Sequence, residues 1–239
     1  MRTLIWFVYF WITLVAMVPF MLYAWYLNRS GQLKRRDAFV ARMVTGWMGS
    51  LLKLAGVKVE VCGLEHIPKH PVVFVSNHQG NFDIPILLRH LDRPHGLVAK
   101  VELQKLPFVR IWMRYLGCVF LDRENLRKSA AALNEAAKNL QDGYSMIIFP
   151  EGTRSRGDTV GEFKSGAFKI AYKTGTPIVP IRIDGSYRAM EANQGLRISP
   201  AKVRLQVLPP VEVTGLTKEQ LRQLEQEIRQ QIIGAQKTA

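Results

Sequence analysis

The sequence predicts an α/β protein with a mixed, mostly parallel sheet flanked by helices and with an N-terminal membrane-anchoring helical segment. From about residue 57 onward, short apolar runs rich in β-branched and aromatic residues alternate with stretches of helical periodicity. Runs that are apolar throughout are typical of strands that helices cover on both faces. Before residue 57, a long stretch without charged side chains predicts the anchor.

The anchor is predicted over residues 4–27, a run of 24 residues without charge, whereas about 20 helical residues cross a bilayer. A signal peptide is a poorer interpretation, because the run is too long and no small-residue cleavage site follows it. If the segment spans, the basic residues at positions 29–36 place the following domain in the cytoplasm. Pro19 leaves two alternatives open, a spanning helix or a hairpin that dips into the membrane.

An amphipathic helix is predicted over residues 38–55, because apolar residues recur there at a spacing of three to four. They are Phe39, Val40, Met43, Trp47, Leu51 and Leu54. Such a helix either lies flat in the membrane interface or covers the core of the domain that follows, and both interpretations stay open. The predicted division is therefore an N-terminal membrane-associated segment, residues 1–56, and an α/β domain, residues 57–239.

The α/β domain is predicted to contain strands and helices in alternation. The strands are expected at residues 57–62, 72–76, 96–99, 117–121, 144–149, 177–183 and 203–208. The helices are expected near residues 84–91, 125–141, 162–173 and 217–233. Thr217 and Gln220 form a capping-box pattern at the start of the last helix.

Charge and composition limit the classes of partner. The chain carries 33 Lys and Arg residues against 19 Asp and Glu residues, and this net charge of +14 attracts an anionic membrane or a nucleic acid. No nucleic acid is expected, because no helix-turn-helix, zinc-finger or RNA-binding motif accompanies the charge. The two cysteines, Cys62 and Cys118, form no CxxC pair, so we expect two buried thiols and neither a disulfide nor a metal site.

Residues 76–83 carry the first chemical signal, because His78 and Asp83 follow a predicted buried strand and precede a helix. Ligands of open α/β sheets bind outside the carboxyl ends of the strands. At this spacing the two side chains meet only if His78 lies in the loop and Asp83 at the helix start, with Gly80 helping the chain to bend. Asp83 then fixes the imidazole tautomer and leaves the other nitrogen free to take a proton. The alternative is a helix-capping aspartate beside an ordinary loop histidine.

The second signal is the segment that follows the predicted strand at 144–149. Its residues are Glu151, Gly152, Thr153 and Arg154. An arginine fork and backbone amides beside a glycine suit phosphate oxygens, and the glutamate is placed to orient one of these groups. A polar turn that merely ends a strand is the alternative.

Three further basic residues are candidates for phosphate contacts. Arg123 follows the predicted strand at 117–121, where a surface salt bridge is an equally good interpretation. Lys100 and Lys164 are weaker candidates, because a lysine on so basic a chain is usually a solvated charge. Several other enzyme signatures are missing from the sequence, namely the GxSxG elbow of serine hydrolases, the GxxxxGK[ST] loop and GxGxxG.

Four segments resemble, in order and spacing, the motifs of the glycerolipid acyltransferases. Residues 77–83, with the sequence NHQGNFD, resemble the NHxxxxD motif of that family. Residues 117–123, 149–155 and 179–181 are similar to its second, third and fourth motifs, although Leu121 stands where isoleucine is more usual. The resemblance is closest to the bacterial 1-acyl-glycerol-3-phosphate (lysophosphatidic acid) acyltransferases.

This resemblance implies transfer of a fatty acyl group from acyl-CoA or acyl carrier protein to the sn-2 hydroxyl of lysophosphatidic acid, which gives phosphatidic acid in phospholipid biosynthesis. His78 would be the general base, oriented by Asp83, and no acyl-enzyme, metal or cofactor would be needed. The substrate site would be shaped by Arg123, Glu151, Gly152, Thr153 and Arg154, with Lys100 and Lys164 as further candidates. The enzyme would contact membrane lipids at the inner (cytoplasmic) membrane, with its catalytic domain on the cytoplasmic side.

Three other functions stay open at the level of sequence. The acceptor is another lysophospholipid or a lyso-aminolipid if the pocket has a different shape. The protein is a hydrolase if water takes the place of the acceptor hydroxyl. A non-catalytic, membrane-tethered basic binding module explains the charge and the anchor, but it does not explain the polar residues at the strand ends.

Overall fold

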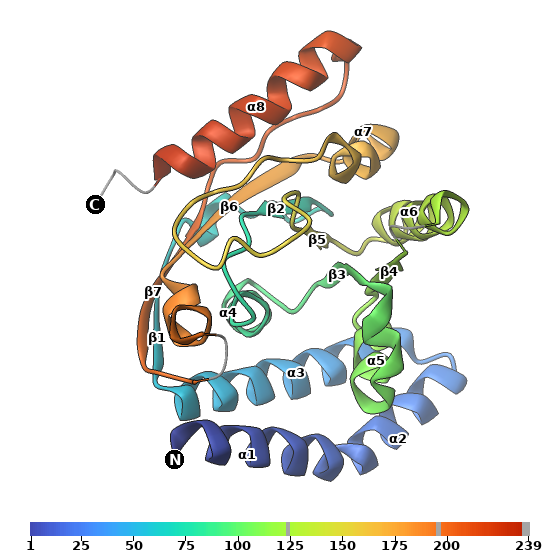
Figure 1. Ribbon diagram of the computed structural model, residues 1–239. Coiled ribbons are helices and arrows are strands. Elements are labelled where there is room, and N and C mark those ends of the chain that lie inside the picture. The colour runs from blue at the N-terminus through green and yellow to red at the C-terminus, as the bar shows by residue number, and fades with distance from the viewer. Residues whose placement is uncertain (123–124, 195–196, 236–239) are drawn as a thin grey trace.

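The computed structural model of the chain describes residues 1–122, 125–194 and 197–235 and contains one seven-stranded sheet with helices on both faces (Figure 1). The strand order is β1-β7-β6-β2-β5-β3-β4. The strands are β1 (Val57–Cys62), β2 (Val73–Ser76), β3 (Gly96–Lys100), β4 (Val119–Leu121), β5 (Met146–Ile148), β6 (Ile178–Asp184) and β7 (Ala201–Val207). Neighbouring strands are parallel except β6 and β7, so the predicted mixed, mostly parallel sheet is confirmed.

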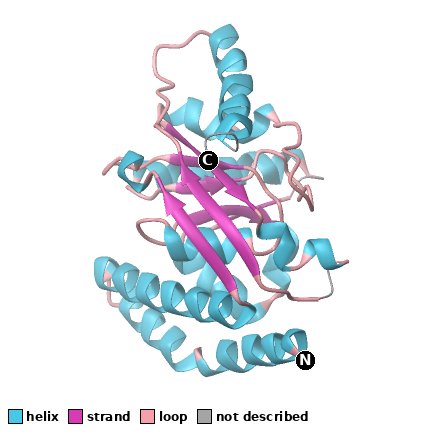
Figure 2. Ribbon diagram, turned by 90° about the vertical axis from the view of Figure 1, so that its left-hand side faces the viewer, coloured by secondary structure: helices cyan, strands magenta, loops and turns pink. Residues whose placement is uncertain are grey.

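Helices form a layer on each face of the sheet. They are α1 (Arg2–Ala16), α2 (Val18–Arg29), α3 (Leu33–Ala55), α4 (Asp83–His90), α5 (Pro107–Tyr115), α6 (Leu126–Gln141), α7 (Lys169–Thr174) and α8 (Lys218–Gly234). In Figure 1, α6, α7 and α8 lie on one side of the sheet, whereas α3, α4 and α5 lie on the other. Figure 2 shows the strands between these two layers, with α1 and α2 stacked beyond α3.

The core consists of two apolar clusters, one on each face of the sheet. Side chains of a strand point alternately to its two faces. In β2, Phe74 packs with residues of α3 and α4, while its neighbours Val73 and Val75 pack with residues of α6, α7 and α8. In β5, Ile147 and Met146 divide in the same way. The central strands are therefore apolar on both faces, as their sequences predict.

The strand order brings three chain segments together at one edge of the sheet. β2 lies between β5 and β6, and both are parallel to it, so the three carboxyl ends are neighbours. The loop after β2 starts at Asn77, the loop after β5 starts at Phe149, and the segment after β6 starts at Gly185. Residues from three distant parts of the sequence therefore meet where an open sheet binds its ligands.

The predicted N-terminal apolar helix is broken into two. α1 and α2 meet at Met17 with a bend of 41°, and Pro19 lies in the first turn of α2. Among the described residues no single helix is long and apolar enough to cross a membrane, whereas this bent pair meets that test by length and composition. Pro19 suits the start of a new helix, because the first turn of a helix has no intrahelical use for its N–H groups.

The predicted amphipathic helix forms the long helix α3, which starts at Leu33 rather than at residue 38. On one side it packs against α4 through buried residues such as Val44. On the other side it holds α1, because Trp6 Nε1 donates to the Leu51 carbonyl at 3.0 Å and Trp47 Nε1 donates to Thr13 Oγ1 at 2.8 Å. This packing supports the second of the two interpretations, in which the helix covers the core of the domain.

Two parts of the secondary structure differ from the prediction. The helix expected over 162–173 is reduced to a 3-10 turn, Ser165–Ala167, and the short α7, because the N–H of Lys164 donates instead to the Pro150 carbonyl. α5 was not predicted, although Pro107 at its start is a signal for a helix N-terminus. The prediction of two buried cysteines is right for Cys118 and wrong for Cys62, which is half-buried because β1 is an edge strand.

The capping box of α8 gives a stability prediction. Thr217 Oγ1 accepts from the Gln220 N–H, and the Gln220 side chain accepts from the Thr217 N–H. Thr217 is exposed, so Thr217→Ala removes the cap without opening a cavity. We expect a loss of about 1 kcal/mol, or about 2–4 °C in the thermal unfolding midpoint. Thr217→Ser keeps the hydroxyl and is the control, and equal midpoints for the alanine and serine variants would contradict the role of the cap.

Candidate active site

His78 and Asp83 form a hydrogen-bonded pair at the carboxyl end of β2. Nδ1 of His78 lies 2.7 Å from Oδ2 of Asp83, whose side chain is fully buried. The same Oδ2 accepts from the N–H groups of Gln79 at 2.7 Å and Gly80 at 2.9 Å. Oδ1 accepts a short hydrogen bond from Ser186 Oγ. Asp83 is the first residue of α4 rather than its cap, and the helix N-terminus and four donors stabilise its negative charge.

The His78 ring is fixed in orientation and faces a cavity. It stacks on Phe149 with ring centroids 4.0 Å apart and an angle of 20° between the ring planes. An ionised Asp83 accepts from Nδ1, so Nδ1 carries the proton and Nε2 has a lone pair. Nε2 has no hydrogen-bond partner within the described residues, and the side chain is 18% exposed. The arrangement therefore presents a base to the cavity.

Glu151 links the loop after β5 to the loop after β2. Its Oε1 accepts from the His78 N–H at 2.7 Å, and its Oε2 accepts from the Gly161 N–H at 3.0 Å. Burial raises the pKa of Glu151, and the hydrogen bonds from these two N–H groups oppose that shift. Two backbone hydrogen bonds join the same loops, from Ser155 N–H to the His78 carbonyl and from Arg156 N–H to the Gln79 carbonyl. Glu151 therefore shapes the site without lining the cavity.

The cavity that His78 faces has a volume of about 490 Å³ and two kinds of wall. Its polar wall is made of Asn81, Lys100, Glu102, Gly152, Thr153, Arg154 and Arg156. The rest is mainly apolar and comes from α3, α4, β3 and α5, through residues that include Trp47, Leu88, Leu97, Val109, Trp112, Met113 and Leu116. Gly152 has a left-handed backbone with φ of 71°, which favours glycine at this turn. A polar mouth and an apolar interior suit an amphiphilic ligand.

The other predicted site residues are placed differently. Lys100, Thr153 and Arg154 line the cavity, and the Lys100 and Thr153 side chains are exposed. Lys164 is exposed on the loop after β5 and does not line this cavity. Arg123 lies outside the described residues. The structure therefore groups Arg154, Thr153 and Lys100 with His78, and it leaves Lys164 apart from them.

Three residues of the site were not predicted from the sequence. Asn77 bridges β2 to β6, since its side chain donates to the Ile183 carbonyl at 2.9 Å and accepts from the Ile183 N–H at 2.8 Å. Ser186 bonds Asp83, and Glu191 reaches Arg154. Ser186 and Glu191 follow β6, and no sequence signal indicates that β6 pairs with β2. Their position just after a predicted strand is the one sequence signal that could have indicated Ser186 and Glu191 as site residues.

The cavity lining offers a base but no activated nucleophile among the described residues. The thiol in the lining is that of Cys118. Burial raises the pKa of this thiol to about 12, and the hydrogen bond from the Leu97 N–H opposes that shift only in part. A neutral thiol is a weak nucleophile. Its hydroxyl is Thr153, for which the structure gives no hydrogen bond to a base. Across the described part of the chain, no group of three or more His, Cys, Asp or Glu residues is arranged to hold a metal ion.

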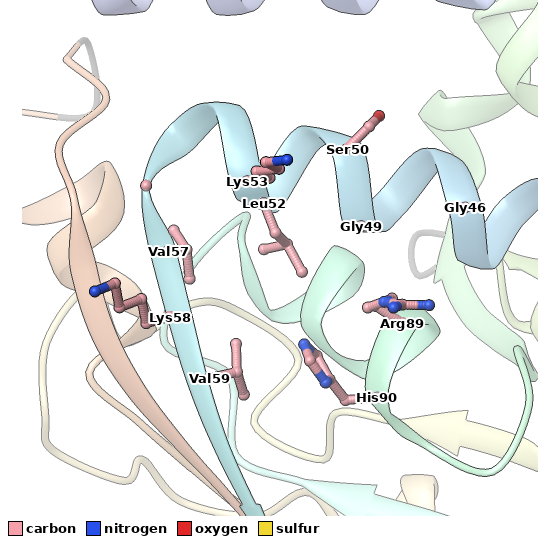
Figure 3. Close-up of a pocket in the computed structure, with 11 residues that line it drawn as sticks. Gly46, Gly49, Ser50, Leu52, Lys53, Val57, Lys58, Val59, Arg89 and His90 are labelled. Carbon is pink, nitrogen blue, oxygen red and sulfur yellow. The ribbon is translucent and has the colours of Figure 1, made fainter.

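A second cavity, of about 520 Å³, lies between α3, β1 and α4 (Figure 3). Its charged or titratable lining residues are Lys53, Lys58, Arg89 and His90. Arg89 and His90 are at the carboxyl end of α4, whereas Asp83 begins the same helix. The second cavity therefore lies beside the last turn of α4, and it contains none of the loops around His78.

Comparison with known proteins identifies the family of this chain. The family model described as Acyltransferase matches residues 58–184, more than half of the chain. A Mycoplasma pneumoniae protein named "Probable 1-acyl-sn-glycerol-3-phosphate acyltransferase" is 41% identical over 61% of this chain, which spans 56% of that protein. The 1-acyl-sn-glycerol-3-phosphate acyltransferase of Borreliella burgdorferi is 36% identical over 76% of this chain and 73% of its own length.

A solved structure extends the likeness to the whole fold. The crystal structure of the 1-acyl-sn-glycerophosphate (LPA) acyltransferase from Thermotoga maritima superposes with a TM-score of 0.84 at 31% identity. The match covers 100% of this chain and 95% of that one, so it includes the N-terminal helices as well as the α/β sheet. The family match, the sequence identity to the relatives and the shared fold show that this chain belongs to the acyltransferase family.

Proposed function

We propose that this chain transfers a fatty acyl group to the sn-2 hydroxyl of lysophosphatidic acid and so forms phosphatidic acid in phospholipid biosynthesis. The observation that carries the proposal is the His78–Asp83 pair, whose free imidazole nitrogen faces a cavity with an arginine at its polar wall and an apolar interior. The names of the relatives support the same acceptor. Membership of the acyltransferase family supports the reaction class.

In this mechanism His78 is the general base. Nε2 takes the proton of the acceptor hydroxyl as that oxygen attacks the thioester carbonyl carbon of the acyl donor. The tetrahedral intermediate then collapses, the carbon–sulfur bond breaks, and the imidazolium returns the proton to the leaving thiolate. Asp83 holds the ring in orientation and stabilises the imidazolium. Because the described residues of the lining offer no activated nucleophile, the acyl group passes directly from sulfur to oxygen without an acyl-enzyme.

The two walls of the cavity bind different parts of the substrates. Arg154 uses one nitrogen, Nη1, for protein contacts, and its Nε and Nη2 have no hydrogen-bond partner within the described residues. A phosphate of the acceptor takes these two donors as a fork. Gly152, Thr153 and Lys100 border the same place. The apolar walls take a fatty acyl chain, whose burial contributes about 0.8 kcal/mol for each methylene.

The donor is a thioester of coenzyme A or of acyl carrier protein, and no cofactor is needed for the transfer. Both donors are anionic, and the net charge of +14 attracts them as it attracts anionic lipid. Nucleic acid has no part in this function. These assignments rest on the chemistry of the site and on the surface charge.

The N-terminal helices attach the enzyme to a membrane. The exposed large apolar side chains of α1 and α2 are Leu4, Ile5, Phe7, Val8, Trp11, Ile12, Val15, Phe20, Leu22, Tyr23, Trp25 and Tyr26. So continuous an apolar surface on a protein is typical of a membrane contact. The basic residues that follow it at positions 29–36 favour the cytoplasmic face of the inner membrane, with the catalytic domain in the cytoplasm.

Replacement of the base tests the mechanism. We expect His78→Ala to lower kcat by about 10²–10⁴-fold, because proton transfer by a positioned base contributes that much. The measurement is phosphatidic acid formation from lysophosphatidic acid and long-chain acyl-CoA by purified protein in detergent. His70 is an exposed loop histidine, and His70→Ala is the matched control.

Three outcomes distinguish the alternatives. Undiminished activity in a folded His78→Ala variant would remove His78 from the mechanism. Free fatty acid released without an acceptor would indicate a hydrolase. If the wild type forms no product from lysophosphatidic acid or other lyso-lipids with either class of donor, the acyltransferase proposal is contradicted.

Polar substitution of the outward face of α1 and α2 tests the membrane contact. We expect Leu4, Ile12, Val15 and Leu22 changed together to Gln to weaken binding to vesicles with anionic lipid by about tenfold or more, since each side chain then loses its apolar burial. Cosedimentation measures the bound fraction, and circular dichroism checks the fold. Leu64→Gln, an exposed apolar position outside these helices, is the control. Equal binding of both variants would contradict a membrane role for this face.

A further inference from the structure

Glu191 is a buried carboxylate that touches the site from outside all four motifs. It begins the 3-10 turn Glu191–Asn193, beyond the end of the family match at residue 184. Its side chain is 3% exposed. Charged side chains are seldom buried unless they are paired, so the partners of this carboxylate indicate its role.

The partners of Glu191 belong to the two loops that build the candidate active site. Oε1 accepts from the Asn81 N–H at 2.8 Å and lies 3.3 Å from Arg154 Nη1. The same Nη1 donates to Asn81 Oδ1 at 2.5 Å. Glu191 and Asn81 therefore hold one end of the guanidinium and leave Nε and Nη2 for another ligand. Oε2 of Glu191 is buried without a hydrogen-bond partner in the described part of the chain.

Gly80 makes room for this carboxylate. A Cβ at Gly80 would lie 2.3 Å from Glu191 Oε2 and 2.7 Å from its Cδ, and no other residue is among its three nearest contacts. The φ of Gly80 is not in the left-handed region, so a left-handed backbone is not the reason for glycine here. Glycine at this position leaves the Glu191 carboxylate its place, which a larger residue would take from it.

We infer that Glu191 is a positioning residue that fixes the guanidinium of Arg154 toward the phosphate of the acceptor lipid. The inference rests on the proposed function and adds a determinant of acceptor affinity to it. An arginine side chain on a loop loses rotamer entropy when it binds a ligand. With Nη1 held by Glu191 and Asn81 beforehand, much of that entropy is lost before the phosphate arrives, and the remaining two donors form a preorganised fork.

A double-mutant cycle on the full-length enzyme tests this role. We expect Glu191→Ala to raise the KM for lysophosphatidic acid about tenfold, within the usual range of coupling between contacting residues, and to change kcat and the KM for acyl-CoA by less than about twofold. In an Arg154→Ala background the same change has little further effect on KM, since there is no guanidinium left to position. Glu191→Gln keeps an acceptor oxygen and gives an intermediate KM. Glu162→Ala, an exposed position on the loop that carries Arg154, is the control.

Gly80 supplies an independent arm of the test. We expect Gly80→Ala to raise the KM for lysophosphatidic acid in the presence of Glu191, because the new methyl group displaces the carboxylate. In the Glu191→Ala background the methyl group has room, so Gly80→Ala adds little to the effect of that variant.

The outcomes separate this inference from the proposed function. An active wild type with additive effects of Glu191→Ala and Arg154→Ala overturns the positioning role. So does a fall in kcat with KM unchanged, or a rise in the KM for acyl-CoA instead. A wild type that does not acylate lysophosphatidic acid overturns the proposed function, and the role of Glu191 falls with it.

Discussion

The candidate site depends on one buried charge, the carboxylate of Asp83. Such a group is tolerated inside a protein only when donors surround it, and here the imidazole of His78, two main-chain N–H groups and the hydroxyl of Ser186 supply them. These bonds set the shape of the loop after β2, the orientation of the ring and the attachment to the segment after β6. Removal of the carboxylate would affect all three at once.

Buried carboxylates also accept hydrogen bonds from the rest of the loop after β2. Each main-chain N–H of residues 78–81 donates to a carboxylate, in order that of Glu151, of Asp83 twice, and of Glu191. Hydrogen bonds to charged groups contribute about 1.5–3 kcal/mol each, so the loop is held firmly between the segments that follow β5 and β6. In the proposed mechanism the base and the arginine gain most from such rigid support, because their geometry is then set before the substrate binds.

The N-terminal segment and the site share a helix. α3 is covered by α1 and α2, and it also supplies Val44, Trp47 and Met48 to the wall of the cavity. The apolar faces of this segment thus point in two directions, outward from α1 and α2 and inward from α3 to the cavity. This arrangement suits the proposed function, in which acceptor and product are both lipids, since the exposed apolar face and the apolar cavity wall belong to one packed unit.

The sequence by itself determined the α/β class, the strands, and His78, Asp83, Glu151 and Arg154 as a group, because polar residues after buried strands are a local signal. Tertiary structure alone decided which strand ends are neighbours. The pairing of β2 with β6 brought Ser186 and Glu191 to the site and placed the Glu191 carboxylate in the space beside Gly80. Lys164, in contrast, lies outside the cavity. Strand order follows from the packing of the whole sheet, and no local pattern of residues encodes it.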